Sequence, residues 1–186
     1  MLVLTRNDLE RLFYRVTCLC LGVEPADQAA QSRVRISWPV DGGSNPGWSR
    51  NENICFLRIS PYRDPYTRQR ERSYEPQPDG ALKETVNYTR CHQVYFICYG
   101  PSAMEDADTI RNNILQPDIR EHLRTEYVIF PIPHIDEPVR VDELINGEWW
   151  GRCDVNVQFY EAASREYVAA SLEQIPEIIM VKEDNT

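Results

Sequence analysis

The chain has 186 residues, of which 42% are hydrophobic, and this suits one domain with a core better than two domains. No run of about 18 apolar residues is present, and the N-terminal residues lack the pattern of a secretion signal, so we expect a soluble, intracellular protein. The net charge is −9, and the residues from Asp136 onward carry twelve acidic side chains against four basic ones. This acidic segment repels phosphate backbones, which argues against a groove there that grips nucleic acid.

The first predicted element is an amphipathic helix from Thr5 to Leu21. Thr5 and Asp8 form a capping-box start, and Gly22 ends the helix. The apolar residues at helical spacing are Leu9, Leu12, Phe13, Val16 and Cys20.

Two strands are predicted next, at residues 33–38 and 53–60. In the first, Val34, Ile36 and Trp38 alternate with polar side chains, which is typical of a strand with one face in water. Turn-forming residues at 41–47 separate the two strands, so we expect them to form a hairpin with a wide loop.

Residues 61–80 are predicted to form a long loop that is mobile or ordered only by a neighbour, because they are rich in Pro, Tyr, Arg and Asp. Arginine and tyrosine together can stack on nucleic-acid bases, but interleaved acidic residues cancel most of the charge, which favours pairing between subunits instead. The arginines are Arg63, Arg68, Arg70 and Arg72, and the acidic residues are Asp64, Glu71 and Glu75.

The longest predicted strand runs from Leu82 to Tyr99. Its second half is apolar on both faces, so we expect it to be central, or to be covered on its second face by a helix or another subunit. Ser102 and Glu105 form a capping-box pattern for a second helix, which Pro117 interrupts, and residues 118–124 add a short turn or two. The buried stripe of this helix is Ala103, Ala107, Ile110 and Ile114.

A pair of tryptophans, Trp149 and Trp150, leads directly into another strand. Successive residues of an extended chain point to opposite sides, so we expect one indole in the core and the other at a contact with a partner.

Short strands are also expected at 127–132 and 139–144, and a C-terminal arm at 162–186, in which 174–181 form an edge strand or an extension. The strand after the tryptophans alternates Cys153, Val155, Val157 and Phe159 with polar residues.

No catalytic, cofactor-binding or metal-binding residue is predicted. The six cysteines contain no C-x-x-C pair and fall in helix or strand patterns, so we expect reduced, buried thiols. His92, His122 and His134 follow no metal-ligand pattern. The adjacent carboxylates at 136–137 and 142–143 point apart on an extended chain, which favours a solvated acidic face over a magnesium site. Motifs for a nucleophile elbow, a P-loop and a dinucleotide fold are absent from the sequence.

Six segments carry a resemblance to a known family, at residues 33–38, 53–59, 68–70, 89–101, 106–111 and 143–154. Their most specific parts in combination are the long strand that ends in Tyr99-Gly100-Pro101 and the Trp149-Trp150 pair followed by Arg152. With their order and spacing over about residues 33–161, they resemble the neck or tail terminator proteins of tailed bacteriophages, which contain a neck terminator-like domain.

The resemblance implies a single domain over residues 1–186 with an α+β fold, in which two or three helices pack on one face of an antiparallel or mixed sheet. It implies a structural virion protein without enzymatic activity, made in the host cytoplasm, that forms a ring, expected to be hexameric, between phage head and tail. The ring would end the tail tube, dock head-completion or adaptor proteins, and let DNA pass through its lumen without specific binding. No membrane partner is implied.

Six residues are predicted at contacts between subunits or with partner proteins. We expect Arg152 to hold a carboxylate of a neighbouring subunit through two hydrogen bonds, and Trp150→Ala to impair ring assembly more than folding. The six residues are Arg68, Arg70, Arg72, Trp149, Trp150 and Arg152.

Other functions stay open as alternatives. A head–tail adaptor or a minor tail protein would place the same kind of ring elsewhere in the assembly. From a different class, a metal-dependent nuclease or nucleotide hydrolase would use His134, Asp136 and Glu137. An RNA-binding module would use the arginine–tyrosine loop, and its binding would depend steeply on salt.

Overall fold

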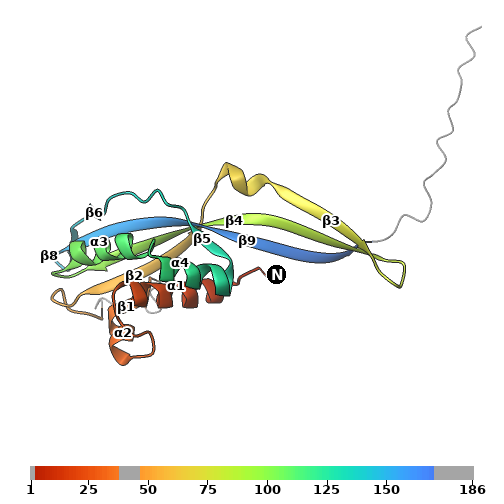
Figure 1. The fold of residues 1–186 in the computed structure, drawn as a ribbon. Helices are drawn as coiled ribbons and strands as arrows, with labels where there is room; N and C mark the ends of the chain where they lie inside the picture. The colour runs from red at the N-terminus through yellow and green to blue at the C-terminus, as the bar shows by residue number, and fades with distance from the viewer. Residues whose placement is uncertain (1–2, 38–46, 170–186) are drawn as a thin grey trace, which may run out of the picture.

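Two paired 18-residue strands form the long axis of the molecule in the computed structural model, which describes residues 3–37 and 47–169 (Figure 1). β4 (Leu82–Tyr99) and β9 (Arg152–Ala169) are antiparallel and pair over their whole length. Each strand therefore spans about 60 Å. The bounds of β4 are those predicted from the sequence, and its predicted central position is confirmed, because β2 and β9 lie on its two sides.

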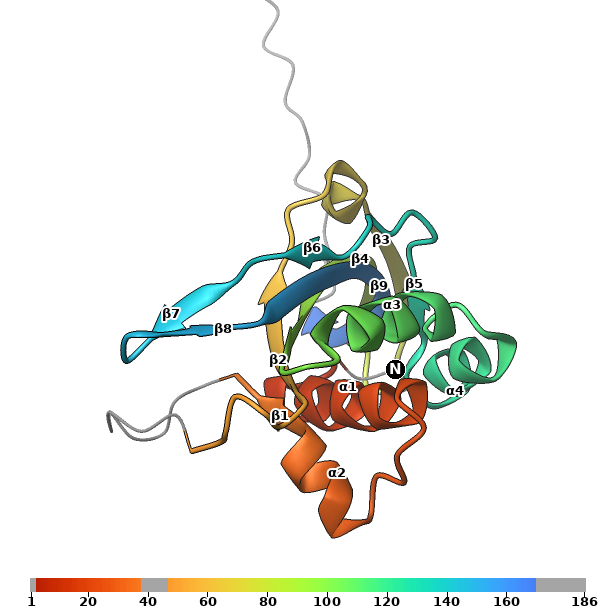
Figure 2. The same ribbon diagram turned by 90° about the vertical axis from the view of Figure 1, so that its left-hand side faces the viewer.

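The described residues form a mixed seven-stranded sheet with the order β1-β2-β4-β9-β5, in which β3 pairs with β4 and β6 with β9. The shorter strands are β1 (Val34–Ile36), β2 (Ile54–Pro61), β3 (Arg70–Pro76), β5 (Ile129–Pro131) and β6 (Val139–Arg140). A separate hairpin consists of β7 (Glu143–Ile145) and β8 (Glu148–Trp150), and it projects from the body in Figure 2.

The helices of the described residues are α1 (Arg6–Cys20), α2 (Gln28–Arg33), α3 (Ala103–Asn113) and α4 (Pro117–Tyr127), with a 3-10 turn η1 (Pro65–Arg68). The predicted capping box of α1 is confirmed, since Thr5 Oγ1 accepts a hydrogen bond from the Asp8 amide and the Asp8 carboxylate accepts one from the Thr5 amide. No helix in the described part of the chain is long and apolar enough to cross a membrane.

The core lies between the sheet and helices α1, α3 and α4, which cover one face of one half of the long strands (Figures 1 and 2). Phe13 of α1 meets Phe159 of β9 at a ring-centroid distance of 4.7 Å, and both are fully buried. This arrangement confirms the α+β fold with helices on one face of a mixed sheet. The buried residues of α3 include Ala103, Ala107 and Ile110, as the helical spacing predicted.

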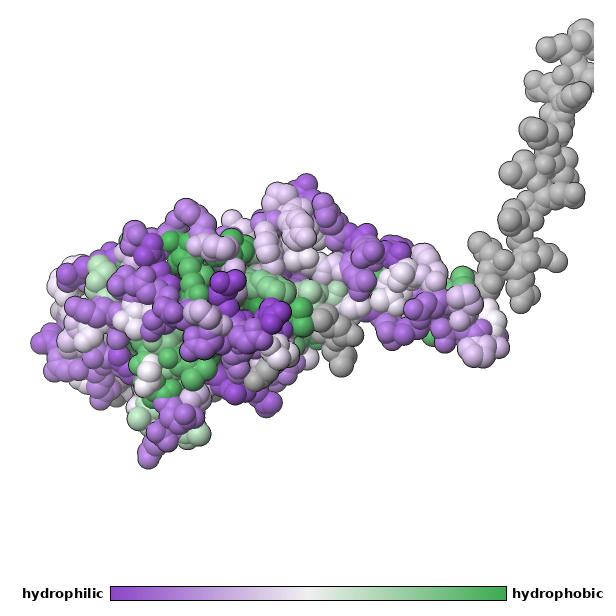
Figure 3. Space-filling model, in the orientation of Figure 1, coloured by the Kyte–Doolittle hydropathy of each residue, from purple (hydrophilic) through white to green (hydrophobic). Residues whose placement is uncertain are grey.

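Beyond the helices, three strands continue as a ribbon, which we define as residues 70–76, 82–88 and 163–169. Figure 1 shows the ribbon extending away from the helix-covered half. In Figure 3 the surface over the ribbon is mainly hydrophilic, whereas apolar surface gathers on the helix-covered half. The loop predicted at 61–80 is therefore wrong for residues 70–76, because they pair as β3 with the first half of β4.

Other expectations also need correction. β1 and β2 pair in parallel, with Val34 beside Cys55, so they do not form a hairpin. The connection from residue 37 to residue 53 is long enough for the crossover that parallel strands need. Residues 118–124 belong to a full helix, α4. Ser102 makes no side-chain cap, and its amide donates instead to Asn53 Oδ1 at 2.9 Å.

The C-terminal part of the chain was expected to form an arm from residue 162. Residues 162–169 are instead the end of β9, paired with the first half of β4. Residues 170–186, with the predicted edge strand or extension at 174–181, lie outside the described residues, as does Trp38.

All six cysteines are buried and free of disulfides, as predicted, and burial raises the pKa of the Cys153 and Cys91 thiols to about 11.

Candidate assembly surfaces

One face of the ribbon combines arginines and tyrosines. Because side chains alternate along a strand, the pairing brings Arg72 of β3, Val86 of β4 and Arg165 of β9 into one row across the sheet. The adjacent row on the same face contains Arg70 of β3 beside Tyr88 of β4. A shallow groove of about 360 Å³ follows this face. We call it the Arg–Tyr face, and its residues are Arg70, Arg72, Tyr74, Glu84, Val86, Tyr88, Arg165 and Tyr167.

Only one of the three arginines on the Arg–Tyr face has a carboxylate partner among the described residues. Arg72 Nη1 donates to Glu84 Oε1 at 3.1 Å, and the hydroxyl of Tyr74 donates to the same oxygen at 3.2 Å. The guanidinium of Arg70 lies over the ring of Tyr88, 5.2 Å from its centroid. The three guanidinium groups and one carboxylate leave this face with a charge of about +2.

The opposite face of the ribbon carries the opposite charge. Glu71, Glu75 and Glu166 lie on it with one cation, Lys83, which pairs with Glu166 at 2.7 Å. We call it the acidic face. The sequence interleaves arginine and glutamate in β3, and the pleat of the strand sorts them onto the two sides.

Arg68, the third arginine of the predicted loop contacts, lies apart from the ribbon. It ends η1, which sits on the sheet face opposite the helices, where the ring of Tyr66 lies 5.4 Å from that of Tyr160. The hydroxyl of Tyr160 also donates to Asp64 at 3.0 Å. The structure thus brings Arg70 and Arg72 together with Arg165, which the sequence reasoning did not single out, and leaves Arg68 exposed elsewhere.

The two tryptophans differ sharply in exposure. Trp150 is only 7% exposed and packs edge-on against Trp48, with ring centroids 5.6 Å apart. Trp149 is 67% exposed and pairs across the β7–β8 hairpin with Leu144, which is 56% exposed. This agrees with one indole inside and one outside, and it shows that Trp150 is not open to a partner. We call Leu144 and Trp149 the Trp149 patch.

Arg152 already has a carboxylate partner within its own chain. Its Nε and Nη2 donate to the two carboxylate oxygens of Asp154, at 2.8 and 2.7 Å, and its Nη1 donates to Glu143 at 3.1 Å. The hydroxyl of Tyr99 also donates to Glu143. The expected paired hydrogen bonds exist, but they join Arg152 to Asp154, which lies two residues further along β9 on the same half-buried face. A role of Arg152 in subunit contacts stays a prediction.

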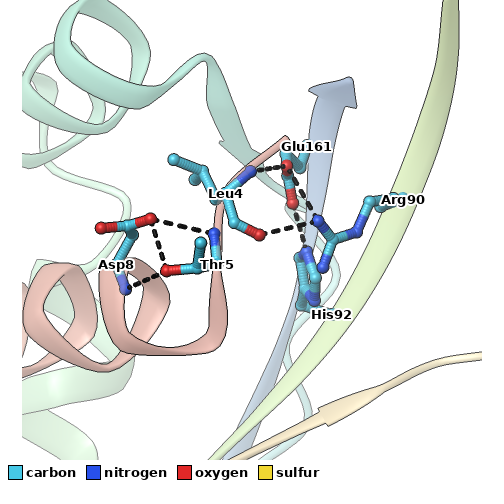
Figure 4. A network of polar contacts seen from close by, with 6 residues as sticks. All are labelled: Leu4, Thr5, Asp8, Arg90, His92 and Glu161. Atoms are coloured by element: carbon cyan, nitrogen blue, oxygen red, sulfur yellow. Dashed lines mark hydrogen bonds and ion pairs between the residues drawn. The ribbon is translucent and has the colours of Figure 1, made fainter. Parts of the chain in front are cut away.

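A buried polar network ties the N-terminal segment to the two long strands where the helix-covered half meets the ribbon (Figure 4). The carboxylate of Glu161, 1% exposed, accepts from the Leu4 amide at 3.0 Å and from Arg90 at 3.3 Å. His92 Nε2 lies 2.6 Å from its other oxygen. Arg90 donates in turn to the Leu4 carbonyl at 2.9 Å. Both oxygens of the Glu161 carboxylate are therefore paired within the chain.

The residues of the nuclease alternative do not converge. Asp136 lies 3.6 Å from His134, while Glu137 pairs with Arg111 at 2.7 Å, and all three of His134, Asp136 and Glu137 are exposed. Within residues 3–37 and 47–169, no three His, Cys, Asp or Glu side chains gather in a way that could hold a metal ion.

The β7–β8 hairpin, which presents Trp149, was missed by the sequence reasoning although it has a local signal. Asn146 and Gly147 both have positive φ, at 52° and 81°, which two-residue hairpin turns require. An Asn-Gly pair between two short β-prone runs predicts such a hairpin. Glu161 had no such signal, because the burial of its carboxylate depends on Leu4, far away in the sequence.

Comparison with known proteins gives one finding that covers nearly the whole chain. A family model described as "Phage neck terminator protein" matches residues 7–185. No curated protein matches the chain. The matched range includes both long strands, the ribbon and the Trp149 patch.

Proposed function

The chain belongs to the family of phage neck terminator proteins, and from this premise we propose that it forms a hexameric ring that ends the tail tube and docks head-completion proteins. The family is structural and belongs to the virion, so the proposed role needs no catalytic residue. Assembly in the host cytoplasm is part of the same proposal.

The observation that supports a place in such an assembly is that the two ends of the long sheet are different, and that no helix among residues 3–37 and 47–169 covers the ribbon or the Trp149 patch. One end is the ribbon, and the other holds the Trp149 patch (Figure 1). Two different surfaces suit a subunit of a larger assembly that meets a different neighbour at each end. Copies that meet front to back along their other surfaces form a ring when the rotation closes.

The Trp149 patch is the proposed contact with another virion protein, the tail tube or a head-completion protein. Exposed tryptophans anchor protein contacts more often than other residues do. The hairpin also lifts Trp149 away from the body (Figure 2), where a partner can reach it.

Native mass spectrometry of the purified chain, alone and with tail tube protein, tests the ring. We expect a discrete species at six times the chain mass of 21.7 kDa in at least one of the two samples. A monomer at every concentration in both samples would overturn the ring.

A tryptophan substitution tests the docking contact. We expect Trp149→Ala to keep the oligomer and to weaken binding of the tail tube or head-completion protein at least tenfold, measured by biolayer interferometry, because a hot-spot side chain contributes about 2 kcal/mol or more. Leu19→Ala, which removes an exposed apolar side chain on α1, is the matched control. Equal binding by wild type and Trp149→Ala to both partners would rule out this patch as the contact.

The alternative functions differ from the proposed one in the partner that the protein would bind or in the activity that it would show. A head–tail adaptor would bind the head side and not the tail tube protein, and a minor tail protein would bind tail components only. Metal-dependent cleavage of nucleic acid that is lost on Asp136→Ala would favour the nuclease, although the exposed and separately paired carboxylates do not support it.

A further inference from the structure

The Arg–Tyr face differs in charge from the rest of the molecule. The whole chain carries −9, yet this face holds three arginines and one glutamate. Counted along the sequence, the neighbouring glutamates cancel the charge of the arginines of β3. The structure removes that objection, because Glu71 and Glu75 lie on the acidic face, with the sheet between them and the arginines.

The arginines of this face are concentrated and have donors to spare. Arg70 and Arg72 are two residues apart on β3, and Arg165 lies two strands away, so the three guanidinium groups share a patch of about 7 by 10 Å. Arg70 and Arg165 make no ion pair with any residue that the structure describes. The exposed rings of Tyr74 and Tyr167, at 53% and 47%, flank them.

The Arg–Tyr face continues toward the helix-covered half. A second groove of about 500 Å³ adjoins the first at Arg70 and Tyr88, and Arg6 and Arg90 also line it. Each of these two arginines has a carboxylate partner, Glu10 and Glu161. The second groove therefore lengthens the Arg–Tyr face, while the arginines without an ion pair among the described residues, Arg70 and Arg165, lie on the ribbon.

We propose that the Arg–Tyr face binds the phosphate backbone of DNA without reading its sequence. Arginine forks match phosphate oxygens, and the hydroxyl groups of the tyrosines beside them can also donate to phosphate oxygens. DNA, rather than another polyanion, is chosen because of the proposed place at the neck, so that part of the inference rests on the proposed function. The charge of the whole chain opposes binding at long range, which makes the contact weak and suited to a moving strand.

Fluorescence anisotropy with a short labelled DNA duplex, at several salt concentrations, tests this face on the full chain. For three neutralised phosphates, we expect log K to fall against log salt with a slope of about −2.7. The double variant Arg70→Gln/Arg165→Gln should bind at least tenfold more weakly at low salt, with a slope about two units shallower. The matched control Glu71→Gln/Glu75→Gln, on the acidic face, should keep the wild-type slope.

Native mass spectrometry of the same samples separates DNA binding from subunit contact. The proposal requires the arginine variant to keep the wild-type oligomeric mass while its DNA affinity falls. It is overturned if the wild type does not bind the duplex at low salt, or if the variant binds as well as the wild type. Loss of the oligomer in the variant also overturns it, because the arginines would then hold carboxylates of a second copy. Failure here leaves the ring untouched, since the wild-type mass is measured separately.

Discussion

Glu161 is the most deeply buried charged residue in the described part of the chain, and its partners come from two other segments, the N-terminal segment and β4. We expect Glu161→Ala to lower the free energy of unfolding by about 3 kcal/mol, because the change leaves Arg90 and His92 beside a buried void without their carboxylate. Urea denaturation of the purified variant measures this. Glu166→Ala, on the exposed end of the same strand, is the control and should change stability by less than about 0.5 kcal/mol. A loss for Glu161→Ala as small as the control would mean that water replaces the carboxylate.

The Glu143 carboxylate makes stability depend on acid pH. The hydrogen bond from the Tyr99 hydroxyl, helped by Arg152, lowers the pKa of Glu143 below its ordinary value of 4.5. A lowered pKa in the folded state gives stability that is complete above about pH 4.5 and is lost as the pH falls through the lower value. We therefore expect Glu143→Gln to flatten the acid side of a plot of melting temperature against pH. An unchanged slope below pH 4.5 would contradict this.

At the scale of elements, Gly100 makes the turn from β4 into α3. Its φ is +109°, and a Cβ atom built there would lie 2.4 Å from the Glu52 carbonyl oxygen. We expect Gly100→Ala to cost clearly more stability than Gly80→Ala, which has φ +84° and open space around it, and which should cost about 1 kcal/mol. Chemical denaturation of the two variants compares them. Equal losses would show that the backbone at residue 52 moves aside.

Elements with a strong local pattern were predicted well. Helix α1, with its capping box, and strand β4, with its alternation, each carry their signal within their own residues. β3 has no buried face, so its burial pattern shows no alternation, and only its pairing with β4 makes it a strand. Strand preference depends on neighbours more than helix preference does, which explains why 61–80 looked like a loop.

At the scale of the whole molecule, the helix-covered half and the ribbon should differ in stability. The ribbon has no helix on either face among the described residues, and three exposed strands hold together weakly in water. We expect amides at 82–88 to exchange hydrogen faster than those at 92–99 of the same strand when the chain is dilute and monomeric. Hydrogen-exchange mass spectrometry measures both segments, and equal protection of the two would contradict this.

The candidate contacts were predictable only in part. The sequence pointed to Arg70, Arg72 and the tryptophan pair, because arginine and tryptophan are frequent contact anchors. It did not separate Trp149 from Trp150, since the aromatic cluster that buries Trp150 is formed by Trp48, which lies about a hundred positions earlier. It also placed the partner of Arg152 in another subunit, whereas Asp154 of the same strand holds it.

The sequence by itself determined the fold class, the first helix, the longest strand and, by resemblance, the family, because each depends on local periodicity or on the order of segments. Only the tertiary structure decided that β1 and β2 run parallel and that Arg165 joins Arg70. It also decided that the arginines and glutamates of β3 lie on opposite faces. The physical reason is that strand pairing joins residues far apart in the chain, and the pleat then assigns each side chain to a face according to that pairing.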